Sequence, residues 1–264
     1  MDNLQRRVKQ EEATDQRPKS KRCKTTATGT KNASGKRCAT TNASISLPPL
    51  INQPVHLSDV RESHSFTDTA HWVIPGMLMQ GGRPQDADEI GNIVKEAKCT
   101  TFVCLQAECV PETDSALLDD GGVQDWKDDP MDLPTYGEEV RALFQKEKNI
   151  DGPTFLHYGI RDMSTAKSME GLTRVVSNLA NRIRLGETIY LHCWGGKGRA
   201  GLVATCLLLE LYPESLDASS ALEYIGELCQ LRNMDGDEDV HYASPETEEQ
   251  REQVQKYYQP VIDN

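Results

Sequence analysis

The 264-residue sequence contains no run of 18 apolar residues, so no membrane-spanning helix is expected. Its start, MDNLQRRVKQEE, lacks the apolar stretch that a secretory signal carries. The eight cysteines form no C-x-x-C pair, and the six histidines do not lie at zinc-ligand spacings from them. We therefore expect free thiols in a reducing compartment, with no structural metal and no cofactor. Apolar residues make up only 37%, which predicts that part of the chain is not packed into a core.

Charge is distributed unevenly along the chain. Residues 1–50 contain eleven Lys/Arg and four Asp/Glu, a net charge of +7, whereas residues 51–264 contain 18 and 37, a net charge of -19. The first segment is polar and repeats KRCKTT as KRCATT fifteen residues later, a composition that cannot bury a core. These patterns predict a disordered basic arm over 1–50, a connector over 51–70 and one folded domain over 71–264.

The basic run KSKRCK at 19–24 has three interpretations: a nuclear-import signal, a patch for acidic partners, or a solvated tail without an address. We expect a cytoplasmic or nuclear location, or both. The acidic body disfavours nucleic acid, so contact with nucleic acid is expected only through the arm.

Strands and helices alternate through the acidic body. Apolar runs predict strands over 72–79, 100–105, 154–160 and 187–192, the first of them broken at Pro75-Gly76. Spacing and caps predict helices over 86–99, 136–148, 167–185 and 200–212, a helix from Asp217 to Leu231, and a last helix capped by Ser244. The acidic stretch 108–134 is expected to be a surface insertion. This alternation predicts an α/β fold with a mainly parallel central sheet flanked by helices.

One segment, 189–201, has the composition of an anion-binding loop. It reads I-Y-L-H-C-W-G-G-K-G-R-A-G, with an apolar strand before it and a helix after it. Gly195, Gly196 and Gly198 allow the backbone N–H groups to turn inward, and the helix N-terminus adds its positive end. A Walker loop is excluded, because Leu191 and Gly198 stand where that motif needs Gly and Ser or Thr.

Cys193 at the base of this loop points to covalent chemistry. Hydrogen-bond donors and a helix N-terminus stabilise a thiolate, so Cys193 is expected to be ionised at neutral pH. Arg199 has the planar fork that grips two phosphoryl oxygens, and His192 could order the loop through backbone hydrogen bonds. A buried structural thiol and a rhodanese-like sulfur-transfer loop are the alternatives. Neither requires an arginine at this spacing.

The motif H192-C193-WGGKG-R199 resembles the H-C-x5-R signature of cysteine-based protein tyrosine phosphatases. The resemblance is to the compact dual-specificity branch and covers about 70–260. The stretch GLVATCLLLELYPE looks like the matching helix of the cyclin-dependent-kinase-associated phosphatase. The family resemblance implies a phosphocysteine intermediate, with Cys193 as nucleophile and Arg199 binding the phosphoryl group. Loop residues that would contact the substrate are Trp194, Gly195, Gly196, Lys197 and Gly198.

The resemblance also implies a general acid about thirty residues before the cysteine. Asp162 follows the strand predicted at 154–160 and lies 31 residues before Cys193, so it is the candidate. Asp128, Asp129 and Asp132 belong to the expected insertion and Asp151 precedes the strand. An ordinary loop carboxylate is the alternative for Asp162.

Position 200 departs from the family pattern. Ala200 replaces the usual Ser or Thr, as in phosphatases of the regenerating-liver type, which predicts slow hydrolysis of the phosphoenzyme or, alternatively, a nearly inactive phosphate-binding module. Lys197 matches one of two lysines in the H-C-K-A-G-K-G-R loop of a phosphoinositide 3-phosphatase, a weak indication of an inositol lipid substrate. Trp194 is expected at the pocket rim, against a phosphotyrosine ring or in plain packing.

The substrate expected from these features is a phosphoprotein. Because the body carries a net charge of -19, phosphosites with basic flanking residues should be favoured. Cys104 or Cys109 could form a disulfide with Cys193 under oxidation, although inert buried thiols are the simpler interpretation.

Overall fold

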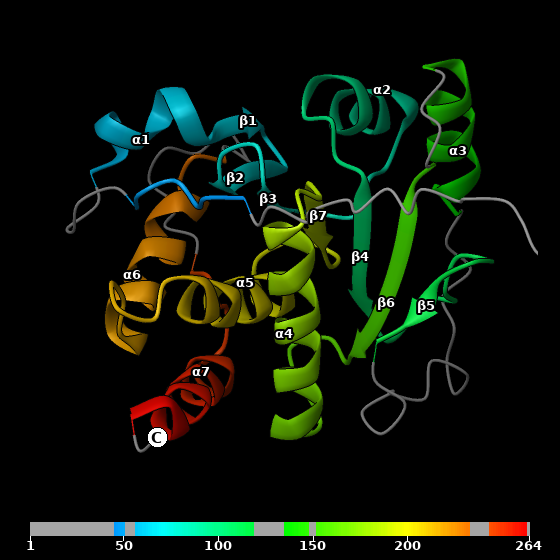
Figure 1. Cartoon of the computed structure of the whole chain (residues 1–264). Coiled ribbons are helices and arrows are strands. Elements are labelled where there is room, and N and C mark those ends of the chain that lie inside the picture. The colour runs from blue at the N-terminus through cyan, green and yellow to red at the C-terminus, as the bar shows by residue number, and fades with distance from the viewer. Residues whose placement is uncertain (1–44, 51–55, 119–134, 148–151, 233–242, 263–264) are drawn as a thin grey trace, which may run out of the picture. The chain divides into compact units, whose positions relative to one another are not determined.

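The computed structural model describes residues 45–50, 56–118, 135–147, 152–232 and 243–262 (Figure 1). The chain divides into two units, Met1–Thr41 and Asn42–Asn264, and all the described residues belong to the second. The predicted basic arm lies outside the described residues except for 45–50, and residues 119–134 of the insertion expected over 108–134 lie outside them as well.

A seven-stranded sheet in the order β1-β2-β3-β7-β4-β6-β5 forms the centre of the described residues. Its strands are β1 Ser65–Thr67, β2 Ala70–Ile74, β3 Leu78–Gly81, β4 Thr101–Gln106, β5 Ala116–Leu117, β6 Thr154–Ile160 and β7 Ile189–His192. The pairs β1–β2 and β2–β3 are antiparallel, whereas β3–β7, β7–β4, β4–β6 and β6–β5 are parallel. The expected α/β fold with a mainly parallel sheet is confirmed.

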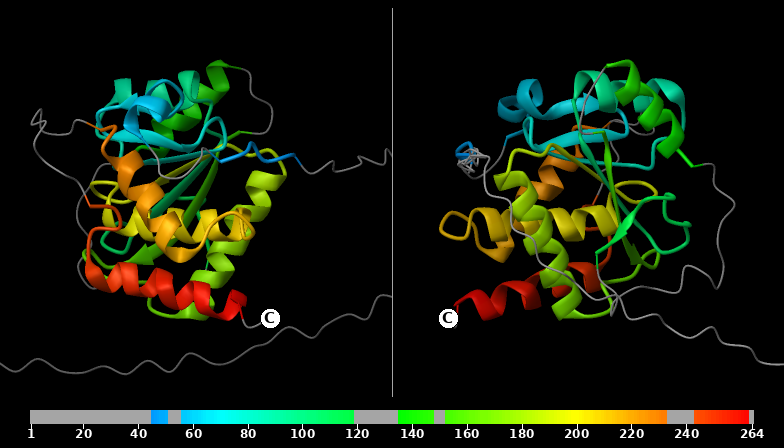
Figure 2. Two further views of the ribbon diagram at one scale, coloured as in Figure 1. Left: turned by 90° about the vertical axis from the view of Figure 1, so that its left-hand side faces the viewer. Right: turned by 45° about the vertical axis from the view of Figure 1, so that its right-hand side comes forward.

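Helices cover both faces of this sheet (Figures 1 and 2). They are α1 Leu57–His64, α2 Ala87–Gly91, a π-helix Asn92–Glu96, α3 Gly137–Lys146, α4 Met169–Arg184, α5 Gly198–Leu211, α6 Ala218–Cys229 and α7 Glu248–Ile262. Along β4, Val103 and Leu105 join the core shared with α4 to α7, while Phe102 joins the core of α2 and α3. Successive strand residues face opposite sides, so one short strand serves two hydrophobic cores.

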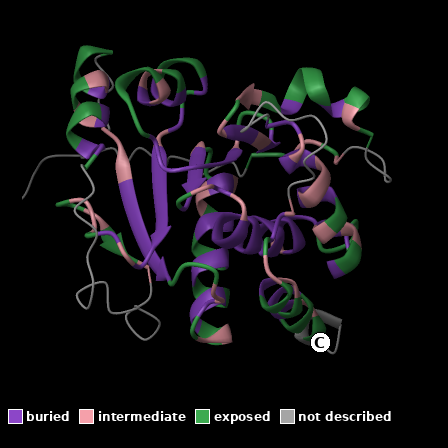
Figure 3. Cartoon of the chain, turned by 180° about the vertical axis from the view of Figure 1, so that it is seen from behind, coloured by how far each residue is buried: buried purple, intermediate pink, exposed green. Residues whose placement is uncertain are grey.

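Helix α5 is buried on all sides, which Figure 3 shows as a continuous buried ribbon. It packs against α4, α6, α7 and the sheet, and this explains why its sequence is apolar throughout rather than amphipathic. Helix α5 begins at Gly198, six residues after β7 ends at His192. Strand β7 and helix α5 thus hold the two ends of the Gly-rich loop, residues 193–198, in place.

Four expectations about local structure need correction. The strand predicted over 72–79 is a hairpin, β2 and β3, whose turn contains Gly76 at a φ of +73°. The helix predicted over 86–99 is α2 followed by the π-helix. Part of the expected insertion pairs with β6 as the short strand β5. Ser244 does not cap the last helix: α7 begins at Glu248, and its first turn is capped by Thr247, whose Oγ1 accepts from Gln250 N at 3.2 Å.

The stretch 51–70, expected as a connector, contains α1 and β1 among its described residues. Val60 and His64 lie four residues apart on one buried face of α1, which is helical spacing that sequence reading overlooked. Upstream, Ile45 N donates to Arg184 O at 2.9 Å and Tyr212 OH donates to Pro48 O at 2.9 Å. The domain boundaries at 50 and 70 stay predictions.

Candidate active site

The Gly-rich loop and the segment after β6 line one pocket of about 290 Å³. The lining residues from the loop are Cys193, Trp194, Gly195, Lys197, Gly198 and Arg199, and the other lining residues are Asp162, Met163, Glu246 and Gln250. Cys193 is 3% exposed, which places it at the base of the pocket, whereas Trp194 at the rim is 45% exposed. The structure therefore brings together the three residues on which the predicted chemistry depends.

The backbone carbonyls of the loop are held outward, one after another. Cys193 O lies 3.4 Å from His192 Nδ1, and Trp194 O accepts from Arg83 N at 3.0 Å. The carbonyls of Gly195, Gly196 and Lys197 accept from side chains of Arg232, Gln80 and Ser244. Because a trans peptide is planar, an outward carbonyl turns the following N–H group inward. Five consecutive N–H groups, those of residues 194–198, are thus aimed at the pocket as an anion nest.

Gly196 is required by this loop shape. Its φ is +68°, and a Cβ atom at this position would lie 2.2 Å from the carbonyl carbon of Gly81. The loop packs directly on the backbone at the end of β3, so no side chain fits between them. Substitution of Gly196 would displace the loop or the strand.

Arg199 is the largest fully buried side chain in the site, at 1% exposure. Its NH1 group donates to both carboxylate oxygens of Glu108, at 2.9 and 2.6 Å, and to Ile160 O at 3.1 Å. Burial would raise the pKa of Glu108, but hydrogen bonds from Arg199 and Gln106 outweigh it and the pKa lies below the usual value. An ionised Glu108 therefore neutralises and orients the buried guanidinium.

Sequence reading missed Glu108, which it assigned to a surface insertion. Glu108 follows β4, and β4 and β7 are parallel neighbours. Carboxyl ends of parallel strands deliver their next residues to the same edge of a sheet, so this position could have been found as a second carboxylate beside the loop.

Asp162 lies at the pocket with its side chain 67% exposed, and its Oδ1 is 2.8 Å from NH2 of Arg199. The segment after it is anchored to α7. Gln250 Nε2 donates to Ser164 O at 2.9 Å, and Gln253 exchanges two bonds of 2.8 Å with the backbone of Ala166. These anchors hold Met163 at a φ of +55°, a conformation that an unbranched residue other than glycine adopts at a cost.

His192 is fully buried and stays neutral, since burial and the charge of Arg83 lower its pKa to about 3. Its Nε2 lies 2.7 Å from the hydroxyl of Tyr136, the N-cap residue of α3. Together with the contact to Cys193 O, this fixes the ring against the base of the loop. Ala200, in the first turn of α5, is fully buried.

Cys104 and Cys109 are buried and free, as are the other described cysteines. They share a hydrogen bond, which raises the pKa of Cys104 and lowers that of Cys109. Arg83 NH1 also contacts Cys109 Sγ at 3.6 Å. A disulfide from either cysteine to Cys193 stays a prediction.

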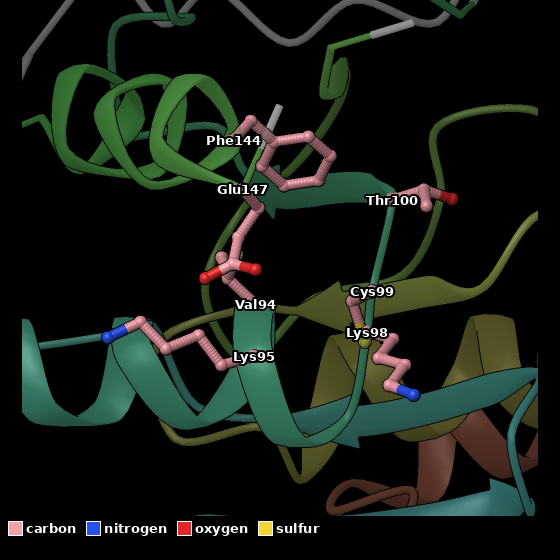
Figure 4. A pocket seen from close by; sticks show the side chains of 7 residues that line it. All are labelled: Val94, Lys95, Lys98, Cys99, Thr100, Phe144 and Glu147. Atoms are coloured by element: carbon pink, nitrogen blue, oxygen red, sulfur yellow. The ribbon is translucent and has the colours of Figure 1, made fainter. Parts of the chain in front are cut away.

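A second pocket, of about 400 Å³, lies between the π-helix and α3 (Figure 4). It shares no lining residue with the Cys193 pocket. Burial raises the pKa of its Cys99 thiol, so this cysteine is protonated and unreactive. Among the described residues no group of three or more His, Cys, Asp or Glu is arranged to hold a metal, and no described helix is long and apolar enough to cross a membrane.

Comparison with known proteins gives one family match. Residues 136–249 match the model described as "Swiss Army Knife protein, DSP-PTPase phosphatase domain". The "Putative tyrosine phosphatase 067L" of Invertebrate iridescent virus 3 is 41% identical over 98 residues, which cover 33% of this chain. The chain spans 40% of the length of this relative.

Several solved structures are similar in part. Tk-PTP in its active form is 23% identical, with 72% of this chain and 97% of that chain covered and a TM-score of 0.46. PTPMT1 in complex with PI(5)P is 14% identical, covering 74% and 97%, with a TM-score of 0.47. Kinase associated phosphatase (KAP) is 16% identical, covering 71% and 88%, with a TM-score of 0.43.

The segment matched by the family model contains Asp162, Cys193 and Arg199, the three residues that meet in the pocket. On this match, residues 136–249 are similar to a phosphatase domain of the dual-specificity (DSP-PTPase) kind.

Proposed function

We propose that this domain is a metal-independent phosphoprotein phosphatase that works through a phosphocysteine. One observation carries the proposal: Cys193, Arg199, Asp162 and the inward N–H groups of the loop line a single pocket. The loop donors and the guanidinium supply positive charge where the phosphoryl oxygens would lie, which is the role a metal ion plays in other phosphatases.

The reaction proceeds in two displacements. The Cys193 thiolate attacks phosphorus, the bond to the leaving oxygen breaks, and Asp162 delivers a proton to that oxygen. Water then attacks the phosphocysteine after losing a proton to Asp162, which releases inorganic phosphate and restores the thiolate. Arg199 and the N–H groups of residues 194–198 hold the equatorial oxygens through both steps.

The substrates that we propose as the preferred class are phosphoproteins dephosphorylated at tyrosine, or at both tyrosine and serine or threonine, with basic residues beside the phosphosite. Glu246 and the exposed Asp162 both line the pocket, so a cationic neighbour of the phosphosite would meet carboxylates there. Lys197 at the same pocket keeps a phosphorylated inositol lipid as an alternative substrate.

A phosphate-binding module with little turnover is the second candidate. It is favoured by Ala200, which offers no hydroxyl near the sulfur, and by Arg199, which two carboxylates already engage. Such a protein would bind phosphopeptides without releasing phosphate.

The test is hydrolysis of para-nitrophenyl phosphate by the full chain, with Cys193→Ser as the inactive variant and Cys206→Ser as its control. Cys206 is an equally buried thiol in α5 outside the pocket. Phosphate release that Cys193→Ser abolishes and Cys206→Ser retains supports the enzyme. Tight phosphopeptide binding without release would support the module instead. A panel of phosphotyrosine, phosphoserine and phosphoinositide substrates then ranks the substrate classes.

A further inference from the structure

A second arginine, Arg232, lies behind the Gly-rich loop and is 1% exposed. It follows α6, which ends at Cys229. Its NH1 group donates to Gly195 O at 3.2 Å and to Thr69 O at 3.0 Å. Its NH2 group donates to Gly196 O at 2.9 Å and contacts Cys229 Sγ at 2.9 Å. Two consecutive loop carbonyls are therefore held by one guanidinium.

These bonds fix the orientation of two neighbouring peptide planes. The plane that contains Gly195 O also contains the N–H of Gly196, and the plane of Gly196 O contains the N–H of Lys197. Since glycine imposes few restraints of its own, the conformation of this part of the loop depends on what holds its carbonyls. A planar fork that spans both oxygens sets the angle between the two planes, which a single ammonium could not do.

The charge of Arg232 acts on its surroundings. Burial and then the positive charge of Arg232 lower the pKa of the neighbouring His71 well below its ordinary value, so His71 is neutral. Burying a guanidinium is costly, and an apolar side chain of similar volume would fill the space more cheaply. Simple packing therefore does not explain an arginine at this position.

Resting on the proposed function, we propose that Arg232 is a positioning residue for phosphate binding. It presets the N–H groups of Gly196 and Lys197 toward the phosphoryl oxygens, and it adds a positive charge behind the anion, on the side of the loop away from the pocket. Arg199 would then bind the phosphoryl group directly while Arg232 acts through the loop.

Two readouts separate this role from a merely structural one: the Kd for tungstate, a phosphate-like oxyanion, and the midpoint of thermal unfolding. In Arg232→Met we expect tungstate affinity to fall roughly 10–100-fold, the range seen when an outer partner of an anchored ligand group is lost. Arg232→Lys keeps the positive charge but should also lose tungstate affinity without unfolding, since one ammonium cannot span both carbonyls.

Arg184→Met is the matched control, because Arg184 also donates to a backbone carbonyl, Glu210 O at 3.0 Å, but that carbonyl belongs to α5 and not to the Gly-rich loop. Thermal melts verify folding, and if Arg232→Met does not fold, Arg232→Lys decides. Folded Arg232 variants that bind tungstate within twofold of the parent would overturn the proposal. Neither readout requires turnover, so a parent chain that hydrolyses no phosphate ester would defeat the proposed function and leave this test intact.

Discussion

The NH1 group of Arg199 is shared between both carboxylate oxygens of Glu108, which lies 91 residues earlier in the chain. The pair holds the guanidinium with its NH2 group directed at Asp162, on the pocket side. Glu108 thus fixes the position of the residue that would bind the phosphoryl group.

Glu108→Gln should weaken phosphate-ester turnover without unfolding the domain. The amide retains one acceptor but not the charge, so Arg199 loses part of its restraint. We expect kcat/KM to fall roughly 10–100-fold, comparable to loss of a second-layer partner at a metal site. Steady-state kinetics measure this, with Glu112→Gln as control, a half-buried carboxylate near Arg141 that has no bond to Arg199. Equal kinetics in the two variants would contradict the role of Glu108.

Asp162→Asn tests the general acid. Leaving oxygens that are strongly basic need the proton most, so the loss should be large on phosphotyrosine peptides, about 10²–10⁴-fold in kcat, and smaller on para-nitrophenyl phosphate. Asp88→Asn, on the exposed first turn of α2, is the control. A loss of the same size on both substrates would show that Asp162 serves binding rather than proton transfer.

The short segment from β7 to α5 could be predicted from sequence because its strand, glycines, Cys193 and Arg199 are contiguous. The sheet followed from the alternation of strands and helices. What sequence reading missed are the side chains that hold the loop from outside: Gln80 reaches Gly196 across 116 positions, Ser244 reaches Lys197 across 47, and Arg232 reaches Gly195 across 37.

No local pattern announces such contacts. Ser244 shows the difficulty, since a serine shortly before acidic residues fits a helix cap, and only the packed fold reveals that its hydroxyl donates to Lys197 O at 2.9 Å instead. Tertiary hydrogen bonding overrode a sound local preference. The same holds for Glu108, whose bond to Arg199 depends on the pairing of β4 with β7.

Ala200→Ser tests whether hydrolysis of the phosphoenzyme limits turnover. If it does, the parent shows a burst of released phenol and the variant has a faster steady state, by about tenfold for one added hydrogen bond to the leaving sulfur. Ala204→Ser, an equally buried alanine one turn further along α5, controls for a hydroxyl in this helix. Absence of a burst in the parent together with an unchanged rate in Ala200→Ser would refute the idea.

Trp194 and Met163 are exposed by 45% and 55% at the rim of the pocket, where a phosphotyrosine ring would lie. Removing the indole or the thioether should lower kcat/KM for phosphotyrosine peptides about 3–10-fold relative to phosphoserine peptides, given the contribution of one aromatic contact. Leu185→Ala removes a side chain that is 51% exposed but lies outside the pocket, so it should leave kcat/KM unchanged for both the phosphotyrosine and the phosphoserine peptides. An unchanged ratio of kcat/KM between phosphotyrosine and phosphoserine peptides in Trp194→Ala would show that the rim does not contact the phosphotyrosine ring.

Buried neutral histidines should make the fold sensitive to acid. Burial and Arg83 lower the pKa of His192 to about 3. Burial likewise lowers the pKa of His157 to about 4; the negative charge of Glu108 opposes this shift, and the charge of Arg83 adds to it to a smaller extent. Below about pH 6.5 the unfolded chain therefore binds protons that the folded chain excludes, so the free energy of unfolding is complete above pH 7 and falls as the pH drops toward 4. Each histidine should cost about 1 kcal/mol per pH unit in that window.

Urea unfolding at pH 7.5, 6.5 and 5.5 measures the change of the free energy of unfolding with pH. His157→Gln should reduce it by one proton, whereas His56→Gln, an exposed residue before α1, should leave it unchanged. If His157→Gln retained the parent slope, His157 would have to be protonated in the folded state.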